Sequence, residues 1–197
     1  MNPQRLRPRT TDALILVDVQ NDFLPGGALA VPAGDAILEP LNQCVREFDR
    51  LGLPVFATRD WHPAGHCSFR EQGGPWPVHC VAGTRGAELS AHLRLPPALR
   101  IVSKGQDLRQ DAYSGFQGTD LGLQLNGVGC RRVFVGGLAT DYCVLATVKD
   151  ALAAGFDAVV LSDAVGAVNV RPEDGAKALQ EMAASGAEIA SVREVIG

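Results

Sequence analysis

The hydrophobic residues of this chain fall into short continuous runs that alternate with longer segments of helical periodicity. Residues 13–17 (ALILV) are all apolar, which is typical of a strand buried on both faces of a parallel sheet. The same reasoning predicts further strands at 54–58, 100–103, 132–138, 158–161 and 188–192. Helices are predicted between them at 35–51, 140–154 and 172–185. The pattern therefore predicts an α/β three-layer sandwich around a six-stranded, mainly parallel, Rossmann-like sheet.

The length of the chain, 197 residues, predicts a single domain over 1–197, in which residues 1–12 form a flexible N-terminal tail. One connection differs from the others, because residues 61–85 are too rich in glycine, proline and histidine for regular structure. Loops of this length inside a compact domain are usually functional. We therefore expect this segment to contribute to a functional site.

Four reactive side chains lie at the ends of predicted strands. Asp18, Asp60 and Lys104 end the first three strands, and Cys143 lies just past the fourth. In open parallel sheets, ligands bind beyond the carboxyl ends of the strands, near the point where the strand order reverses. The fold therefore predicts that these side chains meet at one edge of the sheet. A dinucleotide site is disfavoured, because the first strand leads into DVQND and not into a GxGxxG turn.

Cys143 has the surroundings of an activated nucleophile. It lies on the first turn of the helix predicted from Thr140, where the helix dipole favours a thiolate, and a nearby Lys104 ammonium would do the same. Asp18 could accept the thiol proton and pass it to a leaving amine. Backbone N–H groups near residues 138–140 and at Cys143 could form an oxyanion hole. The alternatives are a packed cysteine, a capping aspartate and a solvated lysine.

Three of the four histidines and both tryptophans lie within a short stretch around the segment 61–85. The candidate metal ligands there are Asp60, His62, His66 and His79. One carboxylate and three imidazoles suit zinc, iron(II) or manganese and leave a position open for a substrate or water. Surface histidines in a Gly/Pro loop are the alternative. Cys67 and Cys80 border this segment, but the histidines already supply enough ligands.

Composition and charge exclude several classes of function. A hydrophobic content of 46% with 20% charged residues is typical of a globular protein, and the net charge of −4 gives no reason to expect a nucleic-acid or membrane partner. The apolar runs are too short for a transmembrane helix, and no signal-peptide pattern is seen, so a cytoplasmic location is expected. Five cysteines without a CxxC pair predict reduced thiols.

Taken together, these segments resemble the nicotinamidase/pyrazinamidase family of the isochorismatase-like cysteine hydrolases. The matching stretches occur in the family's order and cover nearly all of 13–163. They are LVDVQNDF (16–23), DWH (60–62) with His66, WPVHC (76–80), KG (104–105), DAYSGF (111–116) and GLATDYC (137–143). The D-x-H and W-P-x-H-C metal signature separates nicotinamidases from most relatives, and no expected catalytic or metal position departs from the family pattern.

The resemblance implies an isochorismatase-like hydrolase fold and hydrolysis of nicotinamide to nicotinate and ammonia, a step of NAD salvage, with pyrazinamide as a further substrate. It implies that Cys143 is the nucleophile, Asp18 the general base and then acid, and Lys104 the group that stabilises the charged pair. The N–H groups of Ala139 and Cys143 would form the oxyanion hole, next to a cis peptide bond between Leu138 and Ala139. The implied substrate-binding residues are Phe23, Trp76, Leu138 and Ala139.

The resemblance also implies one divalent transition metal per chain, held by Asp60, His62, His66 and His79, with zinc as the first choice and iron or manganese as alternatives. In that family the metal binds the pyridine nitrogen and orients the ring, and it does not generate the attacking hydroxide. The partners expected are small molecules, and homo-oligomerisation stays open. Phe23 and Trp76 would sandwich the pyridine ring, although ordinary packing under the loop is an alternative for Phe23.

Three other functions stay open at this point. In the first, a metal-bound water attacks the substrate and Cys143 is incidental. In the second, the same cysteine chemistry acts on a different small amide, although an acyclic amide would have no ring nitrogen for the metal. In the third, the protein binds a metal or ligand without catalysis, because a fold alone does not fix function.

Overall fold

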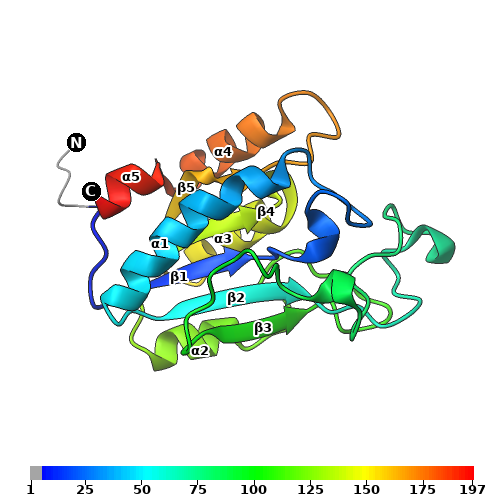
Figure 1. Cartoon of the computed structure of the whole chain (residues 1–197), viewed down its shortest axis with the longest axis horizontal. Coiled ribbons are helices and arrows are strands. Elements are labelled where there is room, and N and C mark those ends of the chain that lie inside the picture. The colour runs from blue at the N-terminus through cyan, green and yellow to red at the C-terminus, as the bar shows by residue number, and fades with distance from the viewer. Residues whose placement is uncertain (1–5) are drawn as a thin grey trace.

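The computed structural model describes residues 6–197, so the first five residues of the predicted tail lie outside the described part of the chain. Within that part, six strands form one parallel sheet in the order β3-β2-β1-β4-β5-β6 (Figure 1). The strands are β1 (Asp12–Val17), β2 (Val55–Asp60), β3 (Arg100–Lys104), β4 (Arg132–Leu138), β5 (Asp157–Gly166) and β6 (Glu188–Ala190). The predicted fold class is confirmed, and every strand pair of this sheet is parallel.

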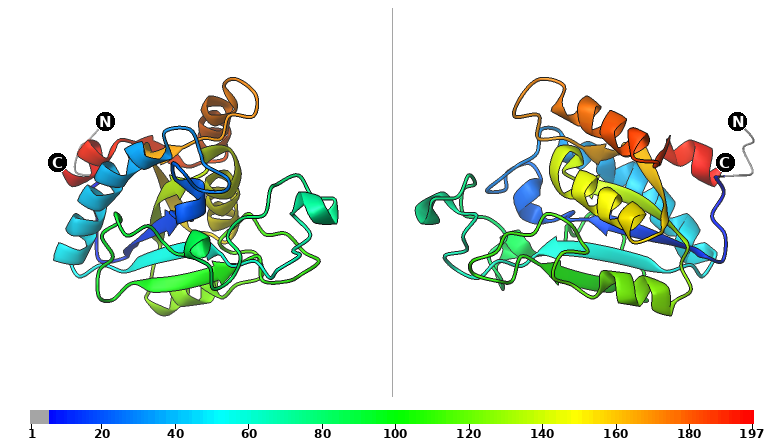
Figure 2. Two further views of the ribbon diagram at one scale, coloured as in Figure 1. Left: turned by 45° about the vertical axis from the view of Figure 1, so that its right-hand side comes forward. Right: turned by 180° about the vertical axis from the view of Figure 1, so that it is seen from behind.

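Helices cover both faces of the sheet and make the outer layers of the sandwich. The helices are α1 (Leu38–Arg50), α2 (Leu121–Gly127), α3 (Leu145–Ala153), α4 (Asp174–Ala184) and α5 (Val192–Ile196). On one face, α1 and α5 pack on the sheet in a shared apolar cluster, and α2, α3 and α4 do so on the other (Figure 1, Figure 2).

The alternation of side chains along β1 explains why both faces are apolar. Leu14 and Leu16 belong to the cluster that contains Phe48 of α1, whereas Ile15 belongs to the cluster that contains Val148 of α3. Successive residues of a strand point to opposite faces, so a strand between two helix layers must be apolar throughout. This is the physical origin of the continuous apolar runs in the sequence.

The order of the strands reverses between β1 and β4. The chain first adds β2 and β3 on one side of β1, then crosses to add β4, β5 and β6 on the other. The crevice at such a reversal lies outside the carboxyl ends of the strands. The connection between β2 and β3 contains two 3₁₀ turns (Arg70–Gln72, Arg85–Ala87) and extends beyond those carboxyl ends (Figure 1).

Several boundaries differ from the prediction. Helices α2 and α5 were not predicted, and the last strand ends at Ala190 and not at 192, because Ser191 begins a capping box with Glu194 that starts α5. The predicted helix 140–154 is split into a π-helical turn (Thr140–Val144) and α3. Strand β5 is longer than predicted and changes its register against β4 between Val135 and Gly137.

The start of the described chain is packed against the sheet. Leu6 is buried in the cluster on the α1 face, and Asp12 is already the first residue of β1. The Arg9 N–H donates to Asp12 Oδ2 at 2.7 Å. The segment from residue 6 to residue 12, predicted to be part of a flexible tail, is therefore held by a hydrogen bond and an apolar contact. Within 6–197, the structure contains no helix with the length and apolar character needed to cross a membrane.

Candidate active site

Four strand ends bring the predicted reactive side chains together at the reversal of strand order. Asp18 directly follows β1, and Asp60 and Lys104 are the last residues of β2 and β3 and pair with each other in the sheet. Cys143 lies in the π-helical turn after β4. All four are buried. The convergence expected from the strand pattern is therefore present in the structure.

Lys104 is the centre of this cluster. Its Nζ lies 2.9 Å from Asp18 Oδ2, 2.6 Å from Asp60 Oδ1 and 3.5 Å from Cys143 Sγ. It also donates to the carbonyl oxygen of Ala112 at 3.0 Å. The ammonium is fully enclosed, so its charge is balanced by the two carboxylates and not by water.

Burial and neighbouring charge set the protonation of the cluster. Burial alone would lower the pKa of Lys104, but Asp18 and Asp60 outweigh it and hold this pKa well above its usual value. Burial raises the pKa of Asp18 above the ordinary range, and Lys104 opposes that effect. Burial also raises the pKa of the Cys143 thiol well above its usual value, against the opposing effect of Lys104. The thiolate expected at the helix terminus is therefore not favoured here, and Cys143 needs a base in order to react.

Thr58 is a polar contact of the cluster that the sequence analysis missed. Its hydroxyl donates to Asp18 Oδ1 at 2.6 Å, and both side chains are fully buried. The bond lowers the pKa of Asp18 and so partly offsets burial. The signal in the sequence was a hydroxyl residue in the otherwise apolar run 54–58, two positions before Asp60.

A second cluster begins at Asp60 and extends into the loop after β2. Ligand atoms of Asp60, His62 and His79 lie within 4.8 Å of one another. The Nδ1 atoms of His62 and His79 lie 2.9 Å and 2.8 Å from the carbonyl oxygens of Gly105 and Pro77, which leaves each Nε2 available. Burial lowers the pKa of His62 to about 4, so its ring is neutral, the form that binds a metal. This donor set fits a divalent transition metal.

Gly105 allows the close approach of His62. It adopts a φ of +63°, and a Cβ at this position would lie 2.5 Å from His62 Cε1. A residue with a side chain would therefore be strained and would displace the imidazole.

The fourth predicted ligand lies at the side of this cluster. The ring of His66 stacks on that of His62 with centroids 4.1 Å apart, but His66 is not part of the close donor set. Its Nδ1 lies 2.8 Å from Ser68 Oγ and its Nε2 lies 3.2 Å from Gln110 O. The structure therefore brings three of the four predicted ligands together and places the fourth beside them.

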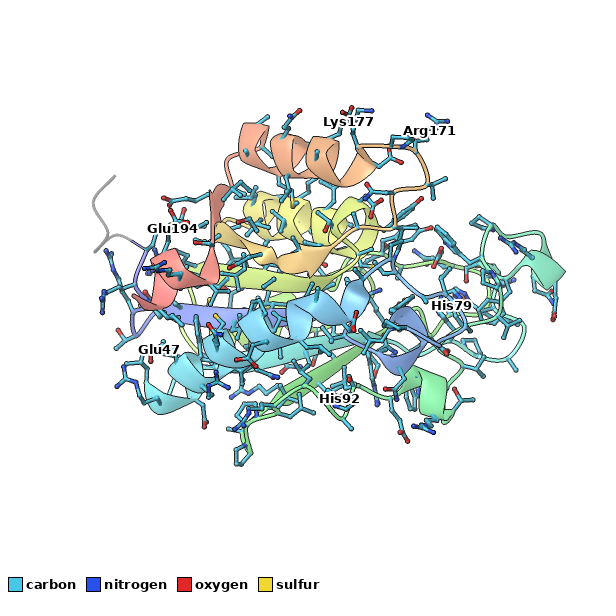
Figure 3. The ribbon with its side chains drawn as sticks, turned by 45° about the horizontal axis from the view of Figure 1, so that its top comes forward. Glu47, His79, His92, Arg171, Lys177 and Glu194 are labelled. Carbon is cyan, nitrogen blue, oxygen red and sulfur yellow. The ribbon has the colours of Figure 1, made fainter. Side chains whose placement is uncertain are left out.

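The remaining cysteines and His92 belong to neither close donor group within residues 6–197, although Cys67 Sγ lies 4.0 Å from His66 Nε2. Cys67 and Cys80 have free thiols, and neither belongs to a donor group found within residues 6–197. His79 and His92 both belong to the connection between β2 and β3, but they lie apart from each other (Figure 3).

A pocket opens over the two clusters. It is lined by Phe23, Leu29, Val31, Asp60, Trp76, His79, Tyr113, Ala139, Tyr142, Cys143 and Val168. The Trp76 Nε1 donates to the Tyr113 hydroxyl at 3.0 Å, and the Trp76 ring lies edge-on to Tyr142 with centroids 5.1 Å apart. Most of the lining is apolar or aromatic, and donor atoms of His79 and Cys143 each lie within 4.8 Å of Asp60, which suits a flat ring with a polar substituent.

The predicted substrate-binding residues divide into two groups. Phe23, Trp76 and Ala139 line the pocket, whereas Leu138 is fully buried in the apolar core. The cis peptide bond expected between Leu138 and Ala139 is confirmed. Tyr113 and Tyr142 line the pocket without having been predicted to do so.

Comparison with known proteins places the chain in a family. The sequence model of the Isochorismatase domain family matches residues 12–194, and the chain belongs to this family. It is 40% identical over 198 residues to a nicotinamidase of Escherichia coli (strain K12), a match that covers 90% of this chain and 93% of the relative.

Two solved structures are similar over nearly the whole length. One is the pyrazinamidase of Pyrococcus horikoshii in complex with zinc, with a TM-score of 0.88 and 50% identity, covering 92% of this chain and 99% of that one. The other is PnC1 from L. infantum in complex with nicotinate, with a TM-score of 0.89 and 38% identity. This match covers 96% of this chain and 97% of that one.

Proposed function

We propose that this protein is a nicotinamidase that hydrolyses the carboxamide of nicotinamide to nicotinate and ammonia and also accepts pyrazinamide. The observation that carries the proposal is the contact of one buried ammonium, Lys104, with Asp18, Asp60 and Cys143, because Asp60 and Cys143 also line the aromatic pocket. The similarity to relatives named nicotinamidase and pyrazinamidase supports the substrate class. Nicotinate would then enter NAD salvage.

Catalysis begins with transfer of the Cys143 proton to Asp18 as the sulfur attacks the carboxamide carbon. The carbonyl oxygen becomes an oxyanion, for which the N–H groups of Ala139 and Cys143 are the proposed donors. Asp18 returns the proton to the nitrogen, the C–N bond breaks, and ammonia leaves a thioester on the sulfur. Water then adds to the thioester with Asp18 again as base, which releases the carboxylate and restores the thiol. Lys104 stabilises Asp18 as its charge changes.

The pocket walls position the ring of the substrate. Phe23 and Trp76 are proposed to flank it, and the Tyr113 hydroxyl fixes the indole of Trp76. Asp60, His62 and His79, with His66 beside them, are the proposed holders of one divalent transition metal, with zinc as the first choice because a zinc-bound relative is known and iron or manganese as alternatives. When bound, such a metal would supply a Lewis acid for the ring nitrogen.

The test is ammonia release from nicotinamide and pyrazinamide by the wild-type protein and by Cys143→Ala. Cys130→Ala is the matched control, because Cys130 is also buried but does not line the pocket, and its thiol donates to the Arg132 carbonyl oxygen at 3.3 Å. We expect activity in the wild type and the control, and a loss of about three orders of magnitude or more in Cys143→Ala.

The other outcomes contradict specific parts of the proposal. Activity retained by Cys143→Ala would transfer the role of nucleophile to a metal-bound water. A metal-loaded wild type that releases no ammonia from either amide would show that the substrate is a different one.

A further inference from the structure

Gln20 is a buried polar residue that the proposed reaction does not use. Its side-chain amide spans the last residue of β2, because Oε1 accepts from the Asp60 N–H at 2.8 Å and Nε2 donates to the Asp60 carbonyl at 2.8 Å. The same Nε2 donates to the Ala87 carbonyl at 2.9 Å. Gln20 has no exposed surface, so each of these bonds replaces a bond to water.

The backbone of Asp60 is thereby fixed at the point where the sheet ends. Asp60 must hold its side chain between two groups, with Oδ1 at 2.6 Å from Lys104 Nζ and Oδ2 at 3.7 Å from His62 Nε2. A short side chain can serve two partners only if its own backbone does not rotate. The Gln20 amide supplies this constraint in the manner of a neighbouring strand.

Asp22 makes a similar contact to the backbone next to His79, the ligand on the opposite side of the proposed metal site from Asp60. Its Oδ2 accepts from the backbone N–H of Cys80 at 2.7 Å, and Cys80 directly follows His79. The carbonyl of Cys80 in turn accepts from the His62 N–H at 3.0 Å. A Cβ at Gly86 would overlap the Asp22 carboxylate, so this aspartate is enclosed by the loop that it holds.

We propose that Gln20 and Asp22 are positioning residues that hold Asp60 and His79, which come from separate segments, at ligating distance. The inference rests on the proposed metal site. Neither residue touches the donor atoms of His62 or His79, so their effect passes through backbone hydrogen bonds. Substituting either residue should therefore allow the ligand atoms to move apart and weaken metal binding. The effect on the reaction at Cys143 should be smaller.

Asn21 lies between these two residues and is a matched control. Its Nδ2 donates to the Arg85 carbonyl at 2.7 Å, so it also fixes the loop that follows the metal-binding segment. Among residues 6–197, it donates hydrogen bonds to Arg85 and Glu88 and not to Asp60, Cys80 or the histidines. An Asn21→Ala variant therefore loses a loop hydrogen bond without releasing a metal donor.

The experiment measures zinc affinity by chelator competition and the visible spectrum of bound cobalt(II), using the full chain stripped of metal at a temperature where each variant is folded. We expect Gln20→Met and Asp22→Ala to bind zinc about 10–100-fold more weakly, as for other residues that orient metal ligands, and to change the cobalt spectrum. Asn21→Ala should match the wild type in both measurements. Asp22→Asn, which keeps a carbonyl oxygen for the Cys80 N–H, should recover most of the affinity.

Wild-type affinity and an unchanged cobalt spectrum in folded Gln20→Met would overturn the proposal. If Gln20→Met does not fold, Gln20→Glu is judged by the same criterion, because it keeps an acceptor for the Asp60 N–H. Failure of both to fold would also overturn it, since Gln20 would then serve the fold as a whole. His62→Ala separates this inference from the proposed function: if its zinc affinity equals that of the wild type, the metal site itself is wrong.

Discussion

Lys104 shows how one residue can determine the chemistry of the whole cluster. A single ammonium lies between two carboxylates and a thiol without contact to solvent. Such a charge is stable in the interior only while its partners remain, and removing one member of a buried pair typically costs about 3–5 kcal/mol. The arrangement also gives Asp18 a neighbour whose positive charge persists when the carboxylate gains or loses a proton.

Thr58 is expected to keep Asp18 in the ionised form that can accept the thiol proton. A hydroxyl donor to a buried carboxylate contributes roughly 1.5–3 kcal/mol, and Thr58→Val removes it with little change of shape. We expect kcat/KM for nicotinamide to fall by about 10–100-fold. Because the hydroxyl opposes the effect of burial on the pKa of Asp18, its loss raises this pKa further. The acidic limb of the kcat/KM profile should then move to higher pH.

Thr147→Val is the control for this pH profile. Thr147 is equally buried, and its hydroxyl accepts from the Gly115 N–H at 2.9 Å and makes no bond to Asp18. This variant should lose stability while its acidic limb stays in place. Equal shifts of the limb in both variants would show that the Thr58 hydroxyl has no specific role at Asp18.

At the scale of elements, the strands were more predictable than the helices. Continuous apolar runs identify buried strands, and each of the six predicted runs overlaps an observed strand, although β5 and β6 differ from the prediction in their bounds. The short helices α2 and α5 were missed because seven and five residues are too few for a helical period to be recognised. The π-helical turn could not be predicted either, because its residues have the pattern of an ordinary first helical turn.

The site residues at the ends of strands could be predicted from the sequence, whereas the site residues in loops could not. Asp18, Asp60 and Lys104 could be placed together from the sheet alone. Tyr113 and Tyr142 enter the pocket through loop and turn conformations that no periodicity encodes. The contacts of Gln20 also needed the structure, because a glutamine in a polar segment gives no indication of its partner.

Gly137 lies in β4 where that strand pairs with β1 next to the site, and we expect that no side chain fits at this position. It pairs with Val17 at a φ of +132°, and a Cβ would overlap the backbone oxygen of Val17. Gly137→Ala should therefore lower the free energy of unfolding by roughly 2–6 kcal/mol through overpacking and backbone strain. Urea denaturation measures this change.

Gly127→Ala is the comparison for that measurement. Gly127 ends α2, and nothing lies within 4 Å of a Cβ built there. The substitution should change the free energy of unfolding by less than about 1 kcal/mol, in the stabilising direction. A Gly137→Ala variant as stable as Gly127→Ala would mean that the junction of β4 and β1 can rearrange.

At the scale of the whole molecule, the proposed metal joins the sheet to the loop that covers it. Asp60 ends a core strand, whereas His79 lies beyond the 3₁₀ turn Arg70–Gln72 in the long connection to β3. A bound ion would tie this connection to the strand ends, in addition to the backbone bonds of Gln20 and Asp22. Metal binding should therefore affect global stability as well as activity.

Metal removal is expected to lower the melting temperature. An ion at 100 times its dissociation constant stabilises the folded state by about 2.7 kcal/mol, which for a domain of this size corresponds to roughly 5–10 °C. Thermal unfolding with zinc and with chelator measures the difference. His62→Ala should lose this response, whereas His92→Ala should keep it, because His92 lies apart from His79 (Figure 3). An equal response in wild type and His62→Ala would place the stabilising ion elsewhere on the protein, and the loop would then be held by its hydrogen bonds alone.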